Sequence, residues 1–317
     1  QGAMPRKKID KLVDFAKDQN VKIGFYGSLP TDAPANFLKF KTDPANFPNE
    51  KIMQDFAIAS EPLIDKNQTN RPWAMASNGW SAIQTLATTA NEGVGGEWEQ
   101  IATEIASFLS MSLSGQPNVG SAIDGKEGGG NAQVNIRDLQ WKVFTPLLYS
   151  IDNYGNIQKT PFAFNAKMTR ITRAYLKLRE KITPYLYTLT RAAQDGMPIV
   201  RPLFLAFPHE RVNYTNQVKH EFMLGNNLLI APITNGREDP SGASLKDNLY
   251  LPDHRTMWID LFTGKKLIGG RIYDKLHYPL WHLPVYVRGG AILQESLRSA
   301  LVYPQTKSSA ILYEDDN

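Results

Sequence analysis

Two apolar runs that end in glycine, asparagine, tryptophan and carboxylate residues are the feature that most constrains the fold. The first leads from Pro72-Trp73-Ala74-Met75 into Asn78-Gly79-Trp80, and the second leads from Asn118-Val119-Gly120 to Asp124-Gly125. An α/β barrel carries its active site on loops at the carboxyl ends of its strands, where such residues gather. Residues 71–135 therefore predict part of a barrel together with the rim that carries its chemistry.

Segments with helical periodicity alternate with these runs. Trp98, Ile101, Ile105 and Phe108 place one apolar face on a predicted helix, and the apolar run at residues 21–26 predicts a short strand. Residues 31–70 are rich in Pro, Asn, Asp and Lys and are predicted to be mostly loop. Helices are predicted at 6–19, 98–109, 135–149 and 166–193. Alternating helices and strands indicate the α/β class.

The pattern changes after Gly196-Met197-Pro198 to short strands separated by turn residues, which is typical of an antiparallel β-sandwich. Strands are predicted at Ile199–Phe207, Leu228–Ile233, Asn248–Leu251, Met257–Leu261, Leu267–Tyr273, Val285–Val287, Leu301–Tyr303 and Ile311–Tyr313. We interpret residues 1–4 as a tag remnant, 5–197 as a barrel portion and 198–317 as a C-terminal β-sandwich. The predicted fold class is a partial (β/α)8 barrel followed by that sandwich.

Composition excludes several kinds of function. A net charge of +4 over 317 residues, with no basic tract, argues against a nucleic-acid partner. The chain has no Cys, and its five His are scattered without ligand spacing, so neither a metal nor another cofactor is expected. No apolar run approaches the roughly 18 residues of a spanning helix, so no membrane partner is expected.

Motifs along most of the chain resemble those of one enzyme family. They are Arg71-Pro72-Trp73, Asn78-Gly79-Trp80, Trp98-Glu99, Leu113-Ser114-Gly115-Gln116-Pro117-Asn118-Val119-Gly120, Ile182-Thr183-Pro184-Tyr185, Arg201-Pro202-Leu203-Phe204, Leu228-Leu229-Ile230-Ala231-Pro232, Trp258-Ile259-Asp260, Leu283-Pro284-Val285-Tyr286-Val287-Arg288 and Leu312-Tyr313-Glu314-Asp315-Asp316. The succession resembles glycoside hydrolase family 31. Val134-Asn135-Ile136-Arg137-Asp138 and Pro279-Leu280-Trp281-His282 resemble its branch acting on isomalto-oligosaccharides and cyclic α-glucans.

The resemblance implies a (β/α)8 barrel followed by β-sandwich domains, and cleavage or transfer of α-glycosyl units with retention. It implies that this chain holds the later barrel strands and the first C-terminal sandwich. An α-linked oligosaccharide is the implied partner, together with a second copy or a further chain that completes the barrel. Family members on this branch are often exported, which suggests a secreted or periplasmic location, although the sequence itself leaves the compartment open.

Retaining chemistry needs two carboxyl groups about 5 to 5.5 Å apart. The family nucleophile, an Asp after an earlier strand, has no match in residues 1–70, and an ungapped comparison puts Gly93 where the family has its acid/base Asp. We name Glu92 and Asp124 as the candidate catalytic residues. Two alternatives stay open, because Glu92 could be a solvated loop residue and Asp124 could hold the turn before Gly125.

Four further residues are candidates for substrate binding. Trp80 and Trp98 could stack on sugar faces, although a Trp at a strand end or a helix start also serves as a core residue. Asp152 and Tyr154 follow another candidate strand and could line the same cleft, with a turn as the alternative.

Three functions compete at this point. The chain could be a retaining α-glucosidase or α-glucosyltransferase whose site needs the missing part of the barrel. It could instead be a catalytically degenerate homologue that binds carbohydrate or a partner protein. The resemblance favours this, because Thr85 stands where the family has an Arg, Ala122 where it has a sugar-binding Asp, and Ala90 and Gly93 within its acid/base motif. It could also be a structural fragment without activity of its own.

Overall fold

The computed structural model describes residues 75–76, 84, 88–91, 93, 95–151, 158–160 and 163–294. All of them belong to the second of the chain's two compact units, which begins at Ser60. The helix and strand expected at 6–26, and the strands expected at 301–303 and 311–313, lie outside the described residues. In the described part, no helix combines the length and apolar character needed to cross a membrane.

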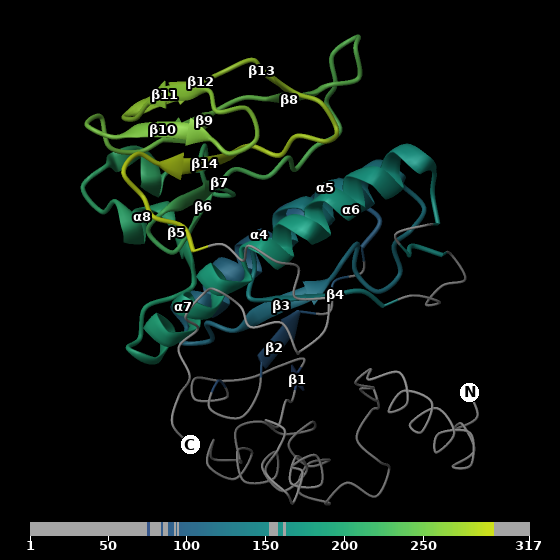
Figure 1. The fold of residues 1–317 in the computed structure, drawn as a ribbon, viewed down its shortest axis with the longest axis horizontal. Coiled ribbons are helices and arrows are strands. Elements are labelled where there is room, and N and C mark those ends of the chain that lie inside the picture. Colours follow the sequence, from purple (N-terminus) through teal and green to yellow (C-terminus); the bar gives the residue numbers. More distant parts are fainter. Residues whose placement is uncertain are drawn as a thin grey trace, which may run out of the picture. The chain divides into compact units, whose positions relative to one another are not determined.

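Four short strands form a parallel sheet, and Figure 1 shows them in sequence order. They are β1 (Met75–Ala76), β2 (Thr88–Asn91), β3 (Val119–Ala122) and β4 (Leu147–Tyr149). Strand β3 is buried throughout, and its Gly120 allows β4 to approach, since a Cβ there would lie 2.5 Å from Cβ of Leu147. Because the strands are parallel, their carboxyl ends meet at one edge of the sheet.

The helices of this half are α4 (Trp98–Leu113), α5 (Ala132–Lys142), α6 (Ala166–Lys181) and α7 (Thr183–Gln194). Asn131 caps α5 and Asn165 caps α6, each through its side-chain oxygen. The prediction of one helix over 166–193 is wrong, because the helix is interrupted at Ile182. Pro184 lies in the first turn of α7, where its missing N–H costs nothing. The helix predicted over 135–149 ends at Lys142, and β4 follows it.

The second half is antiparallel, as the turn spacing predicted. Its main sheet has the order β11-β10-β14-β7-β6-β5, while β12 pairs with β9 and β13 pairs with β8. The strands are β5 (Val200–Pro202), β6 (Phe222–Leu224), β7 (Leu228–Ile230), β8 (Ser244–Lys246), β9 (Leu249–Leu251), β10 (Met257–Asp260), β11 (Lys266–Ile268), β12 (Arg271–Tyr273), β13 (Leu276–Tyr278) and β14 (Val285–Arg288). A short helix α8 (Leu203–Ala206) and a 3-10 helix η4 (Arg211–Tyr214) follow β5, so the strand predicted up to Phe207 stops early.

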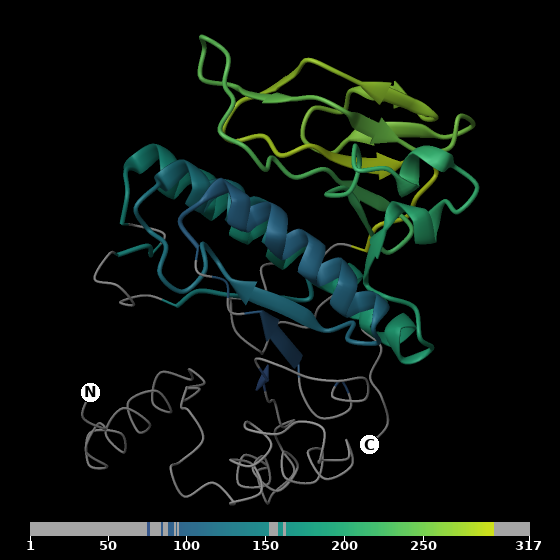
Figure 2. The same ribbon diagram turned by 180° about the vertical axis from the view of Figure 1, so that it is seen from behind.

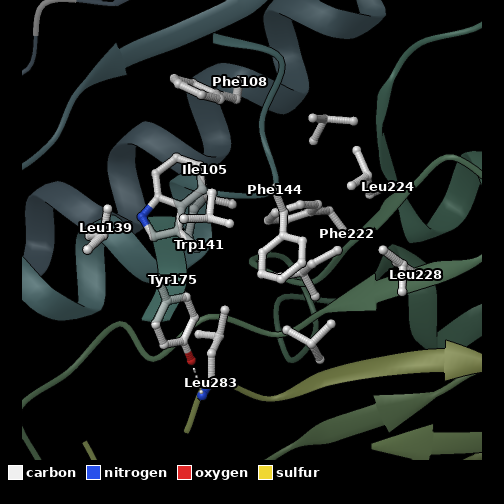
Figure 3. Close-up of a cluster of buried hydrophobic side chains, with 14 of the residues drawn as sticks. Ile105, Phe108, Leu139, Trp141, Phe144, Tyr175, Phe222, Leu224, Leu228 and Leu283 are labelled. Atoms are coloured by element: carbon white, nitrogen blue, oxygen red, sulfur yellow. Dashed lines mark hydrogen bonds between the residues drawn. The ribbon is translucent and has the colours of Figure 1, made fainter. Parts of the chain in front are cut away.

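A large apolar core joins the two halves. In Figures 1 and 2, α4, α5 and α6 lie between the parallel sheet and the six-stranded sheet. Trp141 of α5 belongs to the cluster in Figure 3, with its ring centroid 5.1 Å from that of Phe108 of α4 and 6.3 Å from that of Phe222 of β6. The opposite side of the six-stranded sheet has its own core around Trp258, Leu249 and Met223. Each face of the six-stranded sheet therefore packs against a different core.

Arg137 fixes α5 to the antiparallel half. Its buried guanidinium donates hydrogen bonds to the carbonyl oxygens of Tyr278 (2.9 Å) and His282 (2.8 Å) and to Oγ of Ser244 (2.9 Å). Burial lowers the pKa of Arg137 to about 10, so it stays charged at neutral pH. The loop that carries Trp281 is thereby held against the helices.

Candidate functional site at the carboxyl ends of the parallel strands

The loops after β2 and β3 meet at the carboxyl edge of the parallel sheet. The amide of Lys126 donates to the carbonyl oxygen of Gly93 at 2.8 Å, and the amide of Gly96 donates to Oδ1 of Asp124 at the same distance. Two segments 28 residues apart are thus bonded through both backbone and side chain. This edge is where a parallel α/β fold places its chemistry.

Asp124 is the centre of that junction. It is buried, its φ of 55° lies in the left-handed region, and both carboxylate oxygens accept hydrogen bonds. In addition to Gly96 on Oδ1, the amide of Gly129 donates to Oδ2 at 2.7 Å and Nδ2 of Asn135 donates to it at 3.3 Å. The contacts favour the turn-holding alternative for Asp124, while its assignment as a catalytic residue stays a prediction.

The glycines of the two loops make this junction possible. A Cβ on Gly95 would lie 1.8 Å from the carbonyl oxygen of Asp124, and one on Gly128 would lie 2.1 Å from the same atom. Only residues without a side chain can approach so closely. The glycine run at 128–130 therefore closes around a carboxylate of its own chain.

A buried ionic cluster lies next to the junction, on α4 and α5. Nζ of Lys142 lies 2.6 Å from Oε2 of Glu104 and 2.6 Å from Oδ2 of Asp138, and it also donates to the carbonyl oxygen of Ala122 at 2.7 Å. Oδ2 of Asp138 accepts the amide hydrogen of Asp124 at 2.5 Å. The cluster therefore holds the end of β3 and the start of the following loop.

The charged side chains of this region shift one another's pKa values. Burial raises the pKa of Glu104 and of Asp124, although hydrogen bonds to each carboxylate act in the opposite direction. Burial alone would lower the pKa of Lys142, but the neighbouring Asp138 and Glu104 carboxylates outweigh it and raise the pKa. Lys142 is thus a stable cation between two acids.

The side chain of Glu104 explains why position 93 is glycine. A Cβ on Gly93 would lie 2.0 Å from Oε1 of Glu104, so the carboxylate occupies the space of a side chain at that position. Oε1 is buried and has no hydrogen-bond partner within the described part of the chain. An Asp at residue 93, where the ungapped comparison puts the family's acid/base, would force the carboxylate of Glu104 to shift.

Of the predicted site residues, only Asp124 and Trp98 can be placed. Trp98 is half-buried at the start of α4, and its indole packs against the core and against Gly236, where a Cβ would lie 2.7 Å from Nε1. This favours the packing alternative for Trp98. Glu92, Trp80, Asp152 and Tyr154 lie outside the described residues.

Glu104, Asp138 and Lys142 were not among the predicted site residues. Two signals in the sequence point to them: Glu104 falls on the same helix face as Ile101, Ile105 and Phe108, and Asp138 stands four residues before Lys142. Within the described residues, no group of three or more His, Cys, Asp or Glu side chains is arranged to hold a metal ion.

Comparisons with known proteins agree on one family. The sequence model of the glycosyl hydrolases family 31 TIM-barrel domain matches residues 51–189, and that of the family 31 C-terminal domain matches residues 196–293. Alpha-glucosidase 2 of Bacillus thermoamyloliquefaciens is 29% identical over 260 residues, which cover 78% of this chain and 32% of that protein. An alpha-xylosidase of Saccharolobus solfataricus is 31% identical over 70% of this chain and 31% of its own length.

A solved structure with a similar fold is a family 31 dextranase of Flavobacterium johnsoniae complexed with glucose. It has a TM-score of 0.65 and 28% sequence identity, covering 76% of this chain and 30% of the dextranase. The chain thus spans about a third of the length of these relatives.

Proposed function

The chain belongs to glycosyl hydrolase family 31, and from that premise we propose that it binds and processes α-linked glucosyl oligosaccharides. The family and the predicted fold class, a TIM-barrel domain followed by an antiparallel C-terminal domain, are confirmed. The proposed substrates are isomalto-oligosaccharides and related α-glucans, with hydrolysis or transfer proceeding with retention. The names of the relatives support this range, since they include an alpha-glucosidase and a dextranase.

The observation that carries the proposal is the junction of the loops after β2 and β3. Glu92 directly precedes Gly93 in the sequence, and the carbonyl oxygen of Gly93 accepts the amide hydrogen of Lys126 in the loop after β3. We assign Glu92 the acid/base role and give Asp124 the role of positioning that rim. The nucleophile would come from residues outside the described part, or from a further chain or a second copy that completes the barrel. Trp80, Asp152 and Tyr154 would face the sugar, and Trp98 would support the rim from behind.

The second candidate is a degenerate homologue that binds an α-glucan without cleaving it. Two observations favour it. Both oxygens of Asp124 are already used by backbone and side-chain donors, and Glu104 fills the space that an acidic side chain at position 93 would need. Glu92 would then be the one candidate carboxyl group left for the reaction, whereas retaining cleavage needs two.

The test is to incubate the purified chain with isomaltose, nigerose, panose and the p-nitrophenyl α-glucoside and α-xyloside, following sugar release. Glu92→Gln keeps the shape of the side chain and removes its proton donor, so we expect activity to fall by at least about a hundredfold. Lys126→Gln changes the neighbouring loop without removing a carboxylate and is the matched control. Equal activity in Glu92→Gln and the unmodified chain would contradict the acid/base assignment.

The two candidates are separated by calorimetry with the same sugars. Binding of isomaltose without turnover would support the degenerate homologue, and turnover would exclude it. If the chain neither turns over nor binds any of these sugars, both candidates are contradicted.

A further inference from the structure

The outward surface of α6 carries a stripe of positive charge that is not evident from the small net charge of the chain. The helix has six basic residues and one acidic residue, Glu180. Arg179 turns inward and donates to the carbonyl oxygens of Val143 (2.8 Å) and Pro146 (2.6 Å). The other five basic side chains are exposed: Lys167, Arg170, Arg173, Lys177 and Lys181.

These five residues form one line. At 3.6 residues per turn they fall within an arc of about 120°, and the line is about 21 Å long. Glu180 is half-buried at the margin of the arc, so the stripe itself contains no carboxylate. Like charges at helical neighbour spacing destabilise a helix, so a stripe of this kind has a cost for folding alone.

An apolar groove runs beside the stripe. It has a volume of about 110 Å³ and is lined by Ile171, Ala174, Tyr175 and Leu178 of α6 and by Phe262 and Trp281 of the antiparallel half. Trp281 is 48% exposed, which is unusual for so large an apolar side chain. Cavities of about 150 Å³ hold a benzene-sized molecule, so this groove has room for one apolar side chain.

The groove is rigid. Oη of Tyr175 donates to the carbonyl oxygen of Trp281 at 3.0 Å and accepts from the amide of Leu283 at 3.0 Å, which ties its two walls together. The indole of Trp281 stacks on the ring of His282, with the centroids 5.0 Å apart, and His282 is bonded to Oδ2 of Asp260 at 2.9 Å. A partner would therefore lose little entropy in ordering this surface.

We propose that α6 and the loop bearing Trp281 form a docking surface for an acidic protein segment that inserts one apolar side chain into the groove. Charge complementarity along the stripe supplies the attraction, and the groove supplies the anchor. A lipid surface fits less well, because the apolar residues Ile171 and Tyr175 of α6 are buried and the exposed indole lies in a hollow. A nucleic acid strand would use successive stacking platforms, whereas the groove exposes one indole.

The probe is a fluorescein-labelled peptide of about twelve residues with alternating Glu and one central Phe, titrated with the full chain at low salt. Two matched peptides replace either all Glu by Gln or the Phe by Ser. We expect the first peptide to bind at least about tenfold more tightly than either of the others, and to weaken as salt rises because the Debye length shortens. Similar binding of all three peptides would overturn the proposal.

Variants locate the binding. Arg170→Glu with Lys177→Glu, and separately Ala174→Gln, which narrows the groove, should each weaken binding by at least about tenfold. Lys266→Glu with Arg271→Glu reverses two exposed charges on β11 and β12 and should change it less than about twofold. Equal effects of the two double reversals would overturn the proposal, as would tighter binding of oligothymidine or of phosphatidylserine vesicles through the same α6 residues.

Discussion

Two lysines, one in each half of the molecule, have pKa values that are shifted in opposite directions. Lys142 of α5 is fully buried and touches Glu104, Asp138 and the carbonyl oxygen of Ala122, each within 2.7 Å. Lys246 of β8 is 13% exposed, donates to the carbonyl oxygen of Pro232 at 3.3 Å, and lies 3.9 Å from Glu221. The neighbouring carboxylates raise the pKa of Lys142 against the effect of burial, whereas burial lowers that of Lys246.

The difference shows that burial does not decide the charge state of a lysine. Each N–H of Lys142 has an oxygen acceptor, so the cation is fully solvated by the protein. Lys246 has fewer and longer contacts, and burial raises the pKa of its partner Glu221 to about 8, so that acid is mainly protonated at neutral pH. The rim of the parallel sheet is thus held by two contacts of 2.6 Å between Lys142 and its acids, whereas Lys246 lies 3.9 Å from an acid whose pKa burial raises.

The largest predicted effect comes from removing the first lysine. Lys142→Met leaves Glu104 and Asp138 buried without a cation, and we expect a loss of about 3 to 5 kcal/mol in the free energy of unfolding. Lys246→Met should cost less than about 2 kcal/mol, because Glu221 can keep its proton. Urea unfolding of both variants at neutral pH measures the difference. Equal losses would show that the two lysines are held in the same way.

The elements that support the rim could largely be predicted from the sequence. The periodicity of Trp98, Ile101, Ile105 and Phe108 predicted α4, and the apolar run before Asp124 predicted β3. Both patterns are visible in the sequence because one helix face and one short strand are buried. The break at Ile182 was also visible in principle, since Pro184 fits only the first turn of a helix. Strands β8 and β13 were missed because they are three residues long and mix polar with apolar side chains.

The ionic cluster could not be predicted in the same way. Glu104 and Lys142 are 38 positions apart, and they meet only because α4 and α5 pack on the same side of β3. The choice between two roles for Asp124 likewise depended on Gly96, which is distant in sequence and adjacent in space. Local pattern predicts which segments are helices and strands, and the pairing of charges follows from how those segments pack.

A smaller effect is expected at the contact between Glu104 and the loop after β2. Gly93→Ala would place a Cβ 2.0 Å from Oε1 of Glu104, and we expect a loss of about 2 kcal/mol from the forced shift of the carboxylate. Gly130→Ala is the control, because a Cβ there meets nothing within 4 Å. In the double variant Gly93→Ala with Glu104→Ala the steric cost should disappear, so thermal unfolding should show non-additivity. Additive losses would place the strain elsewhere.

The last prediction is a pH dependence of stability that comes from Glu221, and its effect within one pH unit is the smallest of the three. Its folded-state pKa of about 8 lies above the ordinary value of 4.5 for a Glu carboxyl, so between these values the folded chain binds more protons than the unfolded chain. The free energy of unfolding therefore falls as pH rises through this window, by at most about 1.4 kcal/mol per pH unit for one group. Glu221→Gln should remove that contribution, and the variant should gain stability relative to the unmodified chain as pH rises from 6 to 8.

Asp195→Asn, which removes an exposed carboxylate, controls for the general effect of losing a negative charge. Urea unfolding at several pH values gives the stability difference between each variant and the unmodified chain. A difference for Glu221→Gln that is constant with pH would mean that Lys246 keeps Glu221 ionised. The two buried lysines would then have the same role, and the contrast between the halves of the molecule would reduce to the length of one contact.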